Sequence, residues 1–365
     1  MNKKAAPDFL LILTTLVLLS IGLIMIYSAS AVGASYKFDD AFYFAKRQLL
    51  FAGIGVAAMF AMMNVNYLTW RTWSKIGMLI CFVLLIAVLI PGIGKVAGGA
   101  RSWIGVGAFS LQPSEFTKLA LIAFLAKFLS EHQKQITSLR KGLIPSLTFV
   151  FLAFGMIMLQ PDLGTGAVLV GTCLTMIFIA GARIKHFVYM GLLGLVGLAA
   201  LIISAPYRIK RITSFLNPWD EPQGSGFQII QSLFAIGPGG LFGFGLGESR
   251  QKYQYLPEPH TDFIFAIVSE ELGFIGATFV LLLFFLLLWR GIRIALGAPD
   301  LYGSLLAVGI IGMIAIQVMI NIAVVTGLMP VTGITLPFLS YGGSSLTLML
   351  IGVGVVLNIS RYAKF

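Results

Sequence analysis

Residues Phe9–Tyr27 read FLLILTTLVLLSIGLIMIY, an apolar run without a charged residue. A helix needs roughly 20 consecutive apolar residues to cross the hydrocarbon core of a bilayer. Runs of this kind recur along the whole chain, so the sequence predicts an all-α polytopic membrane protein. The alternative, a membrane β-barrel, would show alternating segments of ~10 residues, whereas these runs are continuous.

The composition supports a membrane protein and bears on its partners. Hydrophobic residues make up 58% of the chain and charged residues 11%, whereas a soluble domain carries about 25% charged residues. The net charge of +11 lies in short loops, as expected for the cytoplasmic side of a membrane protein facing anionic lipids. We therefore expect contact with membrane lipids and no nucleic-acid partner. Cys81 and Cys173 lie in apolar runs, which argues against a disulfide framework or a zinc site.

We predict ten membrane spans in one domain, residues 1–365, with one long polar loop, residues 206–262, between spans seven and eight. The spans cover residues 9–30, 47–66, 76–94, 115–130, 143–160, 164–181, 187–205, 263–289, 303–325 and 341–360. The first run is longer than the about 7–15 apolar residues of a signal peptide, so we expect it to be a retained span.

The basic residues predict the orientation of these spans. Thirteen of them fall in the termini and the loops on one side: Lys3, Lys4, Arg71, Lys75, Lys134, Arg140, Lys141, Arg183, Lys185, Arg290, Arg293, Arg361 and Lys364. Cytoplasmic loops carry an excess of Lys and Arg. Both termini are therefore expected inside the cell, and loop 206–262 outside.

Three polar sets near the outer side could carry chemistry, because ionisable groups at membrane depth are costly and often functional. In the first, Ser114 could cap a helix that starts with Pro113. Glu115 and Lys118 are three apart and can pair on one helix face. The pair is either structural, or Lys118 faces a cavity and meets an anionic ligand, with Arg101 reinforcing it.

The second set is the turn Gln160–Gly166. Asp162 either caps the following helix or serves as a partner for Lys118 or for a metal ion. The third set, His260-Thr261-Asp262, precedes the eighth span and could likewise be a helix cap. Its prolines Pro257 and Pro259 stiffen the approach, and a fixed carboxylate beside a basic loop suits a general base.

Two neighbouring features have simpler readings. Glu270 and Glu271, two turns into the eighth span, are expected to pack against polar residues of neighbouring spans, and His260 to form hydrogen bonds within its loop. The glycine-rich stretch Gly237–Gly247 lacks the Lys-Ser/Thr ending of a phosphate-binding loop. The sequence gives it no role beyond flexibility and close approach.

Five segments resemble the signatures of the SEDS family (shape, elongation, division and sporulation), typified by RodA and FtsW. They are Arg101–Ile104, Gln112–Glu115, Gln160–Gly166, His260–Phe263 and Pro337–Ser345. The resemblance spans essentially the whole chain. Asn217–Trp219, Arg290–Arg293 and Ala298–Gly303 further resemble the branch of the family found in spore-forming Bacillales.

The resemblance implies a peptidoglycan glycosyltransferase that polymerises lipid II outside the membrane, for the cell wall or the spore cortex. Its essential aspartate falls on Asp262, its intramembrane Glu and Lys fall on Glu115 and Lys118, and its short-turn Asp falls on Asp162. It also implies a partner, a class B penicillin-binding protein that crosslinks the glycan.

A single displacement is consistent with these residues. Asp262 would take the proton of the acceptor 4-hydroxyl, while cations stabilise the departing polyprenyl pyrophosphate. The candidate cations are Arg101, Lys118, Arg208, Lys210 and Arg211; His260 and Ser340 are expected to support the site. No step requires a divalent cation, although one could lie near Asp162. A lipid II flippase, or a scaffold for the penicillin-binding protein, would use a similar set of spans.

Overall fold

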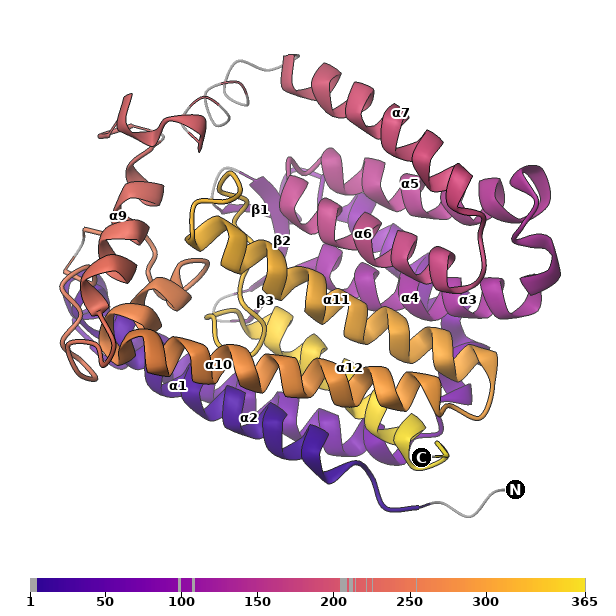
Figure 1. Cartoon of the computed structure of the whole chain (residues 1–365), viewed down its shortest axis with the longest axis horizontal. Coiled ribbons are helices and arrows are strands. Elements are labelled where there is room, and N and C mark those ends of the chain that lie inside the picture. Colours follow the sequence, from indigo (N-terminus) through magenta and orange to yellow (C-terminus); the bar gives the residue numbers. More distant parts are fainter. Residues whose placement is uncertain are drawn as a thin grey trace.

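The structure, a computed structural model, describes residues 5–97, 100–106, 109–203, 209, 213, 215–220, 222–224, 226–253 and 255–364. Long helices form a bundle, with both termini near one end and α9 near the other (Figure 1). The helices are α1 (Phe9–Phe38), α2 (Tyr43–Asn64), α3 (Leu68–Ala87), α4 (Pro113–Glu131), α5 (Ile144–Met158), α6 (Leu163–Ile179), α7 (Ile184–Ile203), α9 (Phe227–Ile236), α10 (Ile264–Leu296), α11 (Leu301–Val325) and α12 (Gly343–Ser360).

Each predicted span overlaps one long helix, and the described residues include seven helices long and apolar enough to cross a membrane. These seven include α1, α2, α3, α10, α11 and α12, and a segment that joins a short π-helix, Leu139–Leu143, to α5. The helix α6 is apolar but shorter. The helix α4 contains four charged residues. The multi-pass membrane architecture is therefore confirmed, while the count of ten crossings stays a prediction.

Several predicted boundaries were wrong because the helices continue beyond the apolar runs. The helix α1 extends to Phe38, well into the predicted outer loop 31–46. Arg71 and Lys75 lie inside α3, and Arg290 and Arg293 lie inside α10, rather than in loops. Long cationic side chains can leave a helix end and reach the surface, so their charge does not terminate the helix.

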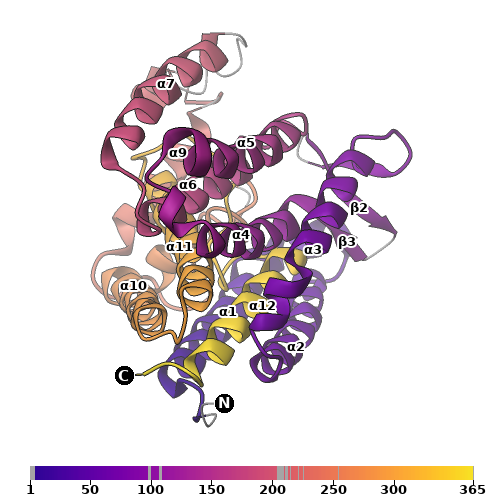
Figure 2. The same cartoon turned by 90° about the vertical axis from the view of Figure 1, so that its right-hand side faces the viewer.

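The all-α prediction missed one small sheet. Strands β1 (Gly94–Ala97), β2 (Ala100–Val106) and β3 (Phe109–Leu111) form an antiparallel sheet in that order between α3 and α4. It projects from the side of the bundle (Figure 2). Lys95 pairs with Trp103, and Ile104 with Leu111. These strands are too short and too rich in glycine for their alternation to be visible in the sequence.

The helix α12 is the central helix of the bundle. Buried residues make up 78% of its most apolar window, against 22% for α2 and for α3. Its contact with α2 is close, because Gly55 of α2 lies against Leu350 and Gly354 of α12 lies against Met59. Outward faces expose large apolar side chains, such as Leu79 (64%) and Phe285 (67%). Such faces are expected where helices meet lipid.

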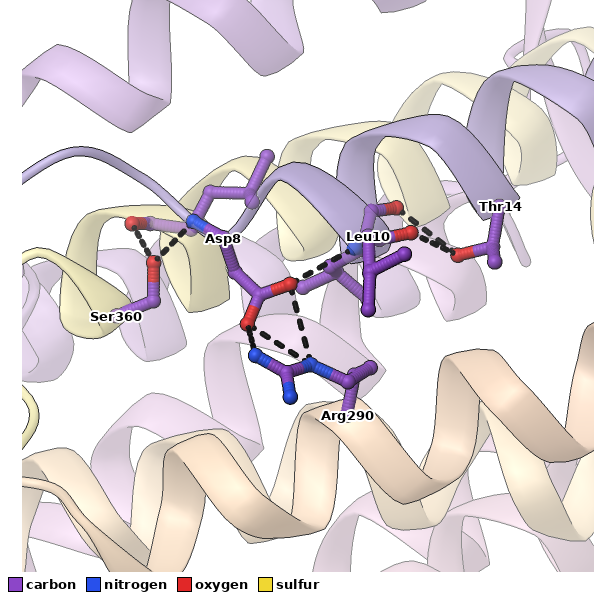
Figure 3. Close-up of polar contacts among 7 residues, drawn as sticks. Asp8, Leu10, Thr14, Arg290 and Ser360 are labelled. Atoms are coloured by element: carbon purple, nitrogen blue, oxygen red, sulfur yellow. Dashed lines mark hydrogen bonds and ion pairs between the residues drawn. The ribbon is translucent and has the colours of Figure 1, made fainter. Parts of the chain in front are cut away.

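The helix ends near the two termini are joined by a buried ion pair (Figure 3). Asp8 caps α1 by accepting from the Leu11 amide at 2.9 Å. The Asp8 carboxylate also accepts from Arg290 of α10, with Nε 3.0 Å from Oδ2. The backbone amide of Asp8 donates to the Ser360 hydroxyl of α12 at 3.1 Å. One aspartate therefore ties together three helices that are far apart in the sequence.

The helix α10 is broken in its N-terminal part. Gly273 has φ 65° and ψ −166°, a conformation that interrupts the helix and that residues with a Cβ rarely adopt. The break separates a short first part, residues 264–272, from the long remainder.

Candidate functional site

Asp262 lies in the turn just before α10, and a hydrogen bond to its main-chain carbonyl holds it there. The Asn321 side-chain amide, from α11, donates to the Asp262 carbonyl at 2.7 Å and to the Ile334 carbonyl at 2.7 Å. The Asp262 carboxylate accepts from the Thr261 hydroxyl at 2.9 Å. Neither Thr261 nor Asp262 caps α10. The N-cap of this helix is Phe263, whose side chain makes no capping hydrogen bond.

The segment between α11 and α12 lies against this turn. The Tyr341 amide donates to the His260 carbonyl at 2.9 Å. Gln48 of α2 donates to the Ser340 carbonyl at 3.2 Å and accepts from the Gly342 amide at 3.2 Å. The Ser340 hydroxyl accepts from the Leu336 amide at 2.8 Å. Ser340 therefore shapes this segment, and its supporting role in the site stays a prediction.

The surroundings of the turn shift two pKa values. Burial raises the pKa of Asp262, the Thr261 hydrogen bond opposes this rise, and the Glu258 charge adds to it. Burial, together with the charge of Lys37, lowers the pKa of His260 from 6.5 to about 4. The His260 ring lies 4.3 Å from that of Phe44 and 5.6 Å from that of Tyr341. His260 is thus a neutral, packed ring near pH 7, and Asp262 is a stronger base than an exposed aspartate.

Glu115 and Lys118 form the predicted pair at the start of α4. Lys118 Nζ lies 2.8 Å from Glu115 Oε1, and the two side chains are 2% and 7% exposed. Within the described part of the chain, Glu115 Oε2, Lys118 Nζ and the Ser114 hydroxyl have no hydrogen-bond partner. The predicted cap at Ser114 is wrong: Pro113 takes the first helical position, which leaves Gln112 as the N-cap.

Asp162 caps α6, accepting from the Thr165 amide at 3.0 Å. Its other oxygen accepts from the Gln112 side chain at 3.1 Å, which links it to the start of α4. A Cβ on Gly164 would overlap the Thr332 carbonyl, so the start of α6 also lies against the segment that Asn321 ties to Asp262. Three of the five family-like segments are thus connected through Gln112, Thr332 and Asn321.

The residues near Asp162 do not fit a metal site. Both of its carboxylate oxygens already accept from N–H groups of the protein. Nor do the described ranges contain a group of three or more His, Cys, Asp or Glu that could hold a metal. We therefore derive no chemical step through a metal ion.

The structure describes only some of the predicted cations. Arg101 lies in β2, and its guanidinium donates to the Leu89 carbonyl at 3.5 Å. Arg208, Lys210 and Arg211 lie outside the described residues. An apolar cavity of about 490 Å³ opens between α3 and α4, lined by residues such as Trp70, Cys81 and Phe116. Lys118 is not among its lining residues, so this cavity is not the one expected beside Lys118.

Sequence reasoning missed three residues of this site: Asn321, Gln48 and Arg47. Arg47, also on α2, stacks 4.4 Å above the Tyr43 ring and hydrogen-bonds Tyr341. The signal for the first two was present, because a lone amide in an apolar helix needs a buried partner. Asn321 and Gln48 are both fully buried.

Comparisons with known proteins identify the family. The family model described as "Cell cycle protein", for FtsW, RodA and SpoVE, matches residues 8–365. Stage V sporulation protein E of Bacillus subtilis is 76% identical over 364 residues, covering all of both chains. A probable peptidoglycan glycosyltransferase FtsW of Trichlorobacter lovleyi is 46% identical, covering 99% of this chain and 95% of its own.

Solved structures agree. The crystal structure of Thermus thermophilus rod shape determining protein RodA matches with a TM-score of 0.72 at 31% identity, covering 98% of this chain and 97% of its own. A chain from a peptidoglycan synthase complex, described in terms of coordinated polymerization and crosslinking, matches with a TM-score of 0.79 at 32% identity, covering 98% of both chains. The chain belongs to the FtsW, RodA and SpoVE family of cell-cycle proteins, the SEDS family whose motifs it carries.

Proposed function

We propose that this protein is a peptidoglycan glycosyltransferase that polymerises lipid II into β(1→4) glycan strands on the outer face of the membrane. The observation that carries the proposal is Asp262, a partly buried carboxylate with a raised pKa held at the end of an apolar helix. The names of its relatives, which include peptidoglycan glycosyltransferases and a sporulation protein, support the same function.

Asp262 acts as the general base. It takes the proton of the acceptor's GlcNAc 4-hydroxyl, and that oxygen attacks the anomeric carbon of the donor's MurNAc. The bond to the pyrophosphate breaks, so the α-linked donor is inverted to a β linkage and polyprenyl pyrophosphate departs. A carboxylate with a raised pKa accepts a proton more readily than an exposed one.

Lys118 and Arg101 stabilise the departing pyrophosphate. Lys118 suits this role because its ammonium makes one ion pair and no hydrogen bond within the described ranges. Arg208, Lys210 and Arg211 remain candidates from sequence alone. Asp162 and Gln112 fix the start of α4, which carries Lys118.

The enzyme crosses the membrane ten times, with both termini in the cytoplasm and loop 206–262 outside. The distribution of basic residues supports this orientation. The partner is a class B penicillin-binding protein, a proposal supported by the match to a synthase complex that couples polymerization with crosslinking. Lipid II is the substrate, its polyprenyl tail remaining in the bilayer.

Lipid II polymerisation by purified protein in proteoliposomes, with and without the penicillin-binding protein, tests this function. Asp262→Ala and Asp262→Asn should lower the rate by about 10²–10⁴-fold, the usual contribution of a general base. The control is Asp220→Asn, which changes an exposed carboxylate of the same outer loop and should keep the wild-type rate. Polymerisation retained by the Asp262 variants would overturn the assignment, and leaflet exchange without polymer would indicate a flippase.

A further inference from the structure

The glycine segment, Gly240–Gly245, completes the hydrogen bonding of the break in α10. In an unbroken helix, each amide donates to the carbonyl four residues earlier. Around the break, two amides and two carbonyls of α10 pair with the glycine segment instead. The four bonds are Phe274 N to Gly240 O (2.8 Å), Ile275 N to Leu241 O (3.1 Å), Phe244 N to Glu270 O (3.0 Å) and Gly245 N to Glu271 O (3.0 Å).

These four bonds matter because the break lies well inside a membrane-spanning helix. An unpaired backbone group is costly in a bilayer, where no water can form a hydrogen bond with it. The pairing also demands glycine on both sides. Gly243 has φ 76°, and a Cβ there would overlap the carbonyl of Glu271; a Cβ on Gly273 would overlap the amide of Gly243. The broken helix and the glycine segment can therefore approach this closely only with glycine at both positions.

The carboxylates beside the break hold the residues that follow the glycine segment. Glu270 accepts from the Ser249 hydroxyl at 2.6 Å and from the Arg250 amide at 2.8 Å. Glu271 accepts from the Ser249 amide at 3.3 Å, and Lys252 Nζ lies 3.6 Å from it. Both glutamates are buried, at 1% and 0% exposed. We call this set the carboxylate clamp.

The clamp also joins α1. Glu271 accepts from the Ser28 hydroxyl at 2.6 Å, so one carboxylate contacts both α1 and the outer loop. The expectation that Glu270 and Glu271 pack against polar groups is confirmed, but most of these groups belong to the outer loop rather than to a neighbouring span.

The clamp closes a loop that contains Asp262. Ser249 and Glu270 are bonded to each other, and the chain between them passes through Asp262 and the first residues of α10, 264–269. We infer that the glycine segment and the carboxylate clamp position Asp262 for proton transfer, with Glu270, Ser249 and Gly243 as positioning residues. This inference rests on the proposed glycosyltransferase function.

Positioning matters because catalysis tolerates little displacement of the catalytic group. A misplacement of 1 Å can cost about 10²-fold in rate. A short half-helix of residues 264–272 has few hydrogen bonds of its own, so its position depends on what holds its inner end. Here the inner end is held by the four backbone bonds and by two buried carboxylates.

The first test compares two glycine variants in the full-length protein. Gly243→Ala, which breaks the fit with Glu271, should lower the kcat of lipid II polymerisation about 10- to 100-fold while the KM stays unchanged. The matched control is Gly237→Ala. Gly237 has φ −59° and open space around its Cα, so its variant should keep the wild-type kcat. Ser249→Ala, which removes one hydroxyl and keeps the backbone, should give a smaller fall in kcat.

The second test is spectroscopic and does not depend on activity. A nitroxide attached to Tyr255→Cys, in the loop between the clamp and Asp262, reports mobility. Tyr255 is 58% exposed, whereas both native cysteines are buried, and the background Cys81→Ala/Cys173→Ala confines the label to position 255. The spectrum should sharpen in Gly243→Ala, Ser249→Ala and Glu270→Gln, but not in Gly237→Ala.

The outcomes separate the two proposals. An unchanged kcat and an unchanged spectrum in Gly243→Ala and Ser249→Ala would overturn the positioning role while leaving the glycosyltransferase intact. A wild-type protein that does not polymerise lipid II would overturn the function, and the nitroxide spectra would still decide whether the clamp orders the loop. A fall in kcat accompanied by an equal rise in KM would point to substrate binding instead of positioning.

Discussion

Two ion pairs of this protein differ in how many of their polar atoms have hydrogen-bond partners. At the end with the termini, both oxygens of Asp8 accept hydrogen bonds from Arg290, and one also caps α1. At the opposite end of the bundle, the Lys118 ammonium contacts one carboxylate oxygen of Glu115. The other Glu115 oxygen has no hydrogen-bond partner within the described residues, and Lys118 has none beyond this ion pair. A buried polar group without a partner is costly. The first pair is therefore suited to stability, and the second to receiving a ligand.

Within this comparison, the largest expected effect comes from neutralising the second pair. Replacing a buried ion pair with neutral residues of similar size is often neutral for stability. The double variant Glu115→Gln/Lys118→Met should therefore unfold near the wild-type temperature but lose about 10²–10³-fold in polymerisation rate, because it removes the cation that we propose to stabilise the leaving group. Rates with purified lipid II and thermal unfolding in detergent measure both quantities.

The matched variant at the other end sharpens the comparison. Asp8→Asn/Arg290→Met removes a pair whose carboxylate is buried and whose Arg290 is 18% exposed, and which contacts no proposed substrate group. It should keep the rate per folded molecule within about threefold, since no transition-state contact is lost. Equal losses of rate in the two double variants would mean that both pairs are merely structural.

A smaller effect is expected at Asn321. Asn321→Leu leaves the carbonyls of Asp262 and Ile334 without their donor, which should cost about 1–3 kcal/mol for each buried group, and should lower the polymerisation rate. Gln317 serves as the control, because it lies one turn away on α11, is 3% exposed, and has an amide oxygen without a hydrogen bond in the described chain. Gln317→Leu should leave the rate unchanged. Denaturation and rate measurements on both variants check this, and similar losses would remove the special role of Asn321.

The smallest effect concerns the pH dependence of stability. His260 has a pKa lowered from 6.5 to about 4, so the folded state resists its protonation. Its contribution is complete above pH 6.5 and is lost as pH falls toward about 4. The wild-type unfolding temperature should therefore fall across this window, and His260→Gln should flatten the fall. Asp262, Glu258 and Lys37 also act on this turn, so an unchanged slope in the variant would assign the pH dependence to them.

Local features of the site were predictable from the sequence, and distant ones were not. The Glu115–Lys118 pair and the Asp162 cap depend on residues three apart, so helical spacing reveals them. Asn321 meets Asp262 across 59 positions of the chain, and no local pattern contains that contact. The error at Ser114 was also local, since a proline at the first helical position makes the residue before it, Gln112, the N-cap.

The same contrast between local and distant features holds for the fold. Apolar runs marked the helices, because each must bury its backbone polar groups within itself in lipid. The break at Gly273 was invisible, since its partner is the glycine segment some 30 positions earlier. The glycine-rich stretch, which seemed merely flexible, is half of a matched pair of segments.

The length of α1 has one further consequence. Its 30 residues span about 45 Å, whereas the hydrocarbon core is about 30 Å thick. The helix must therefore tilt or project into the head groups, and the surrounding bilayer resists either choice at a cost that depends on its thickness. Lys37, whose charge acts on His260, lies in the last turn of this helix. The lipid composition of the membrane thus becomes a physical input to the electrostatics of the turn that carries Asp262.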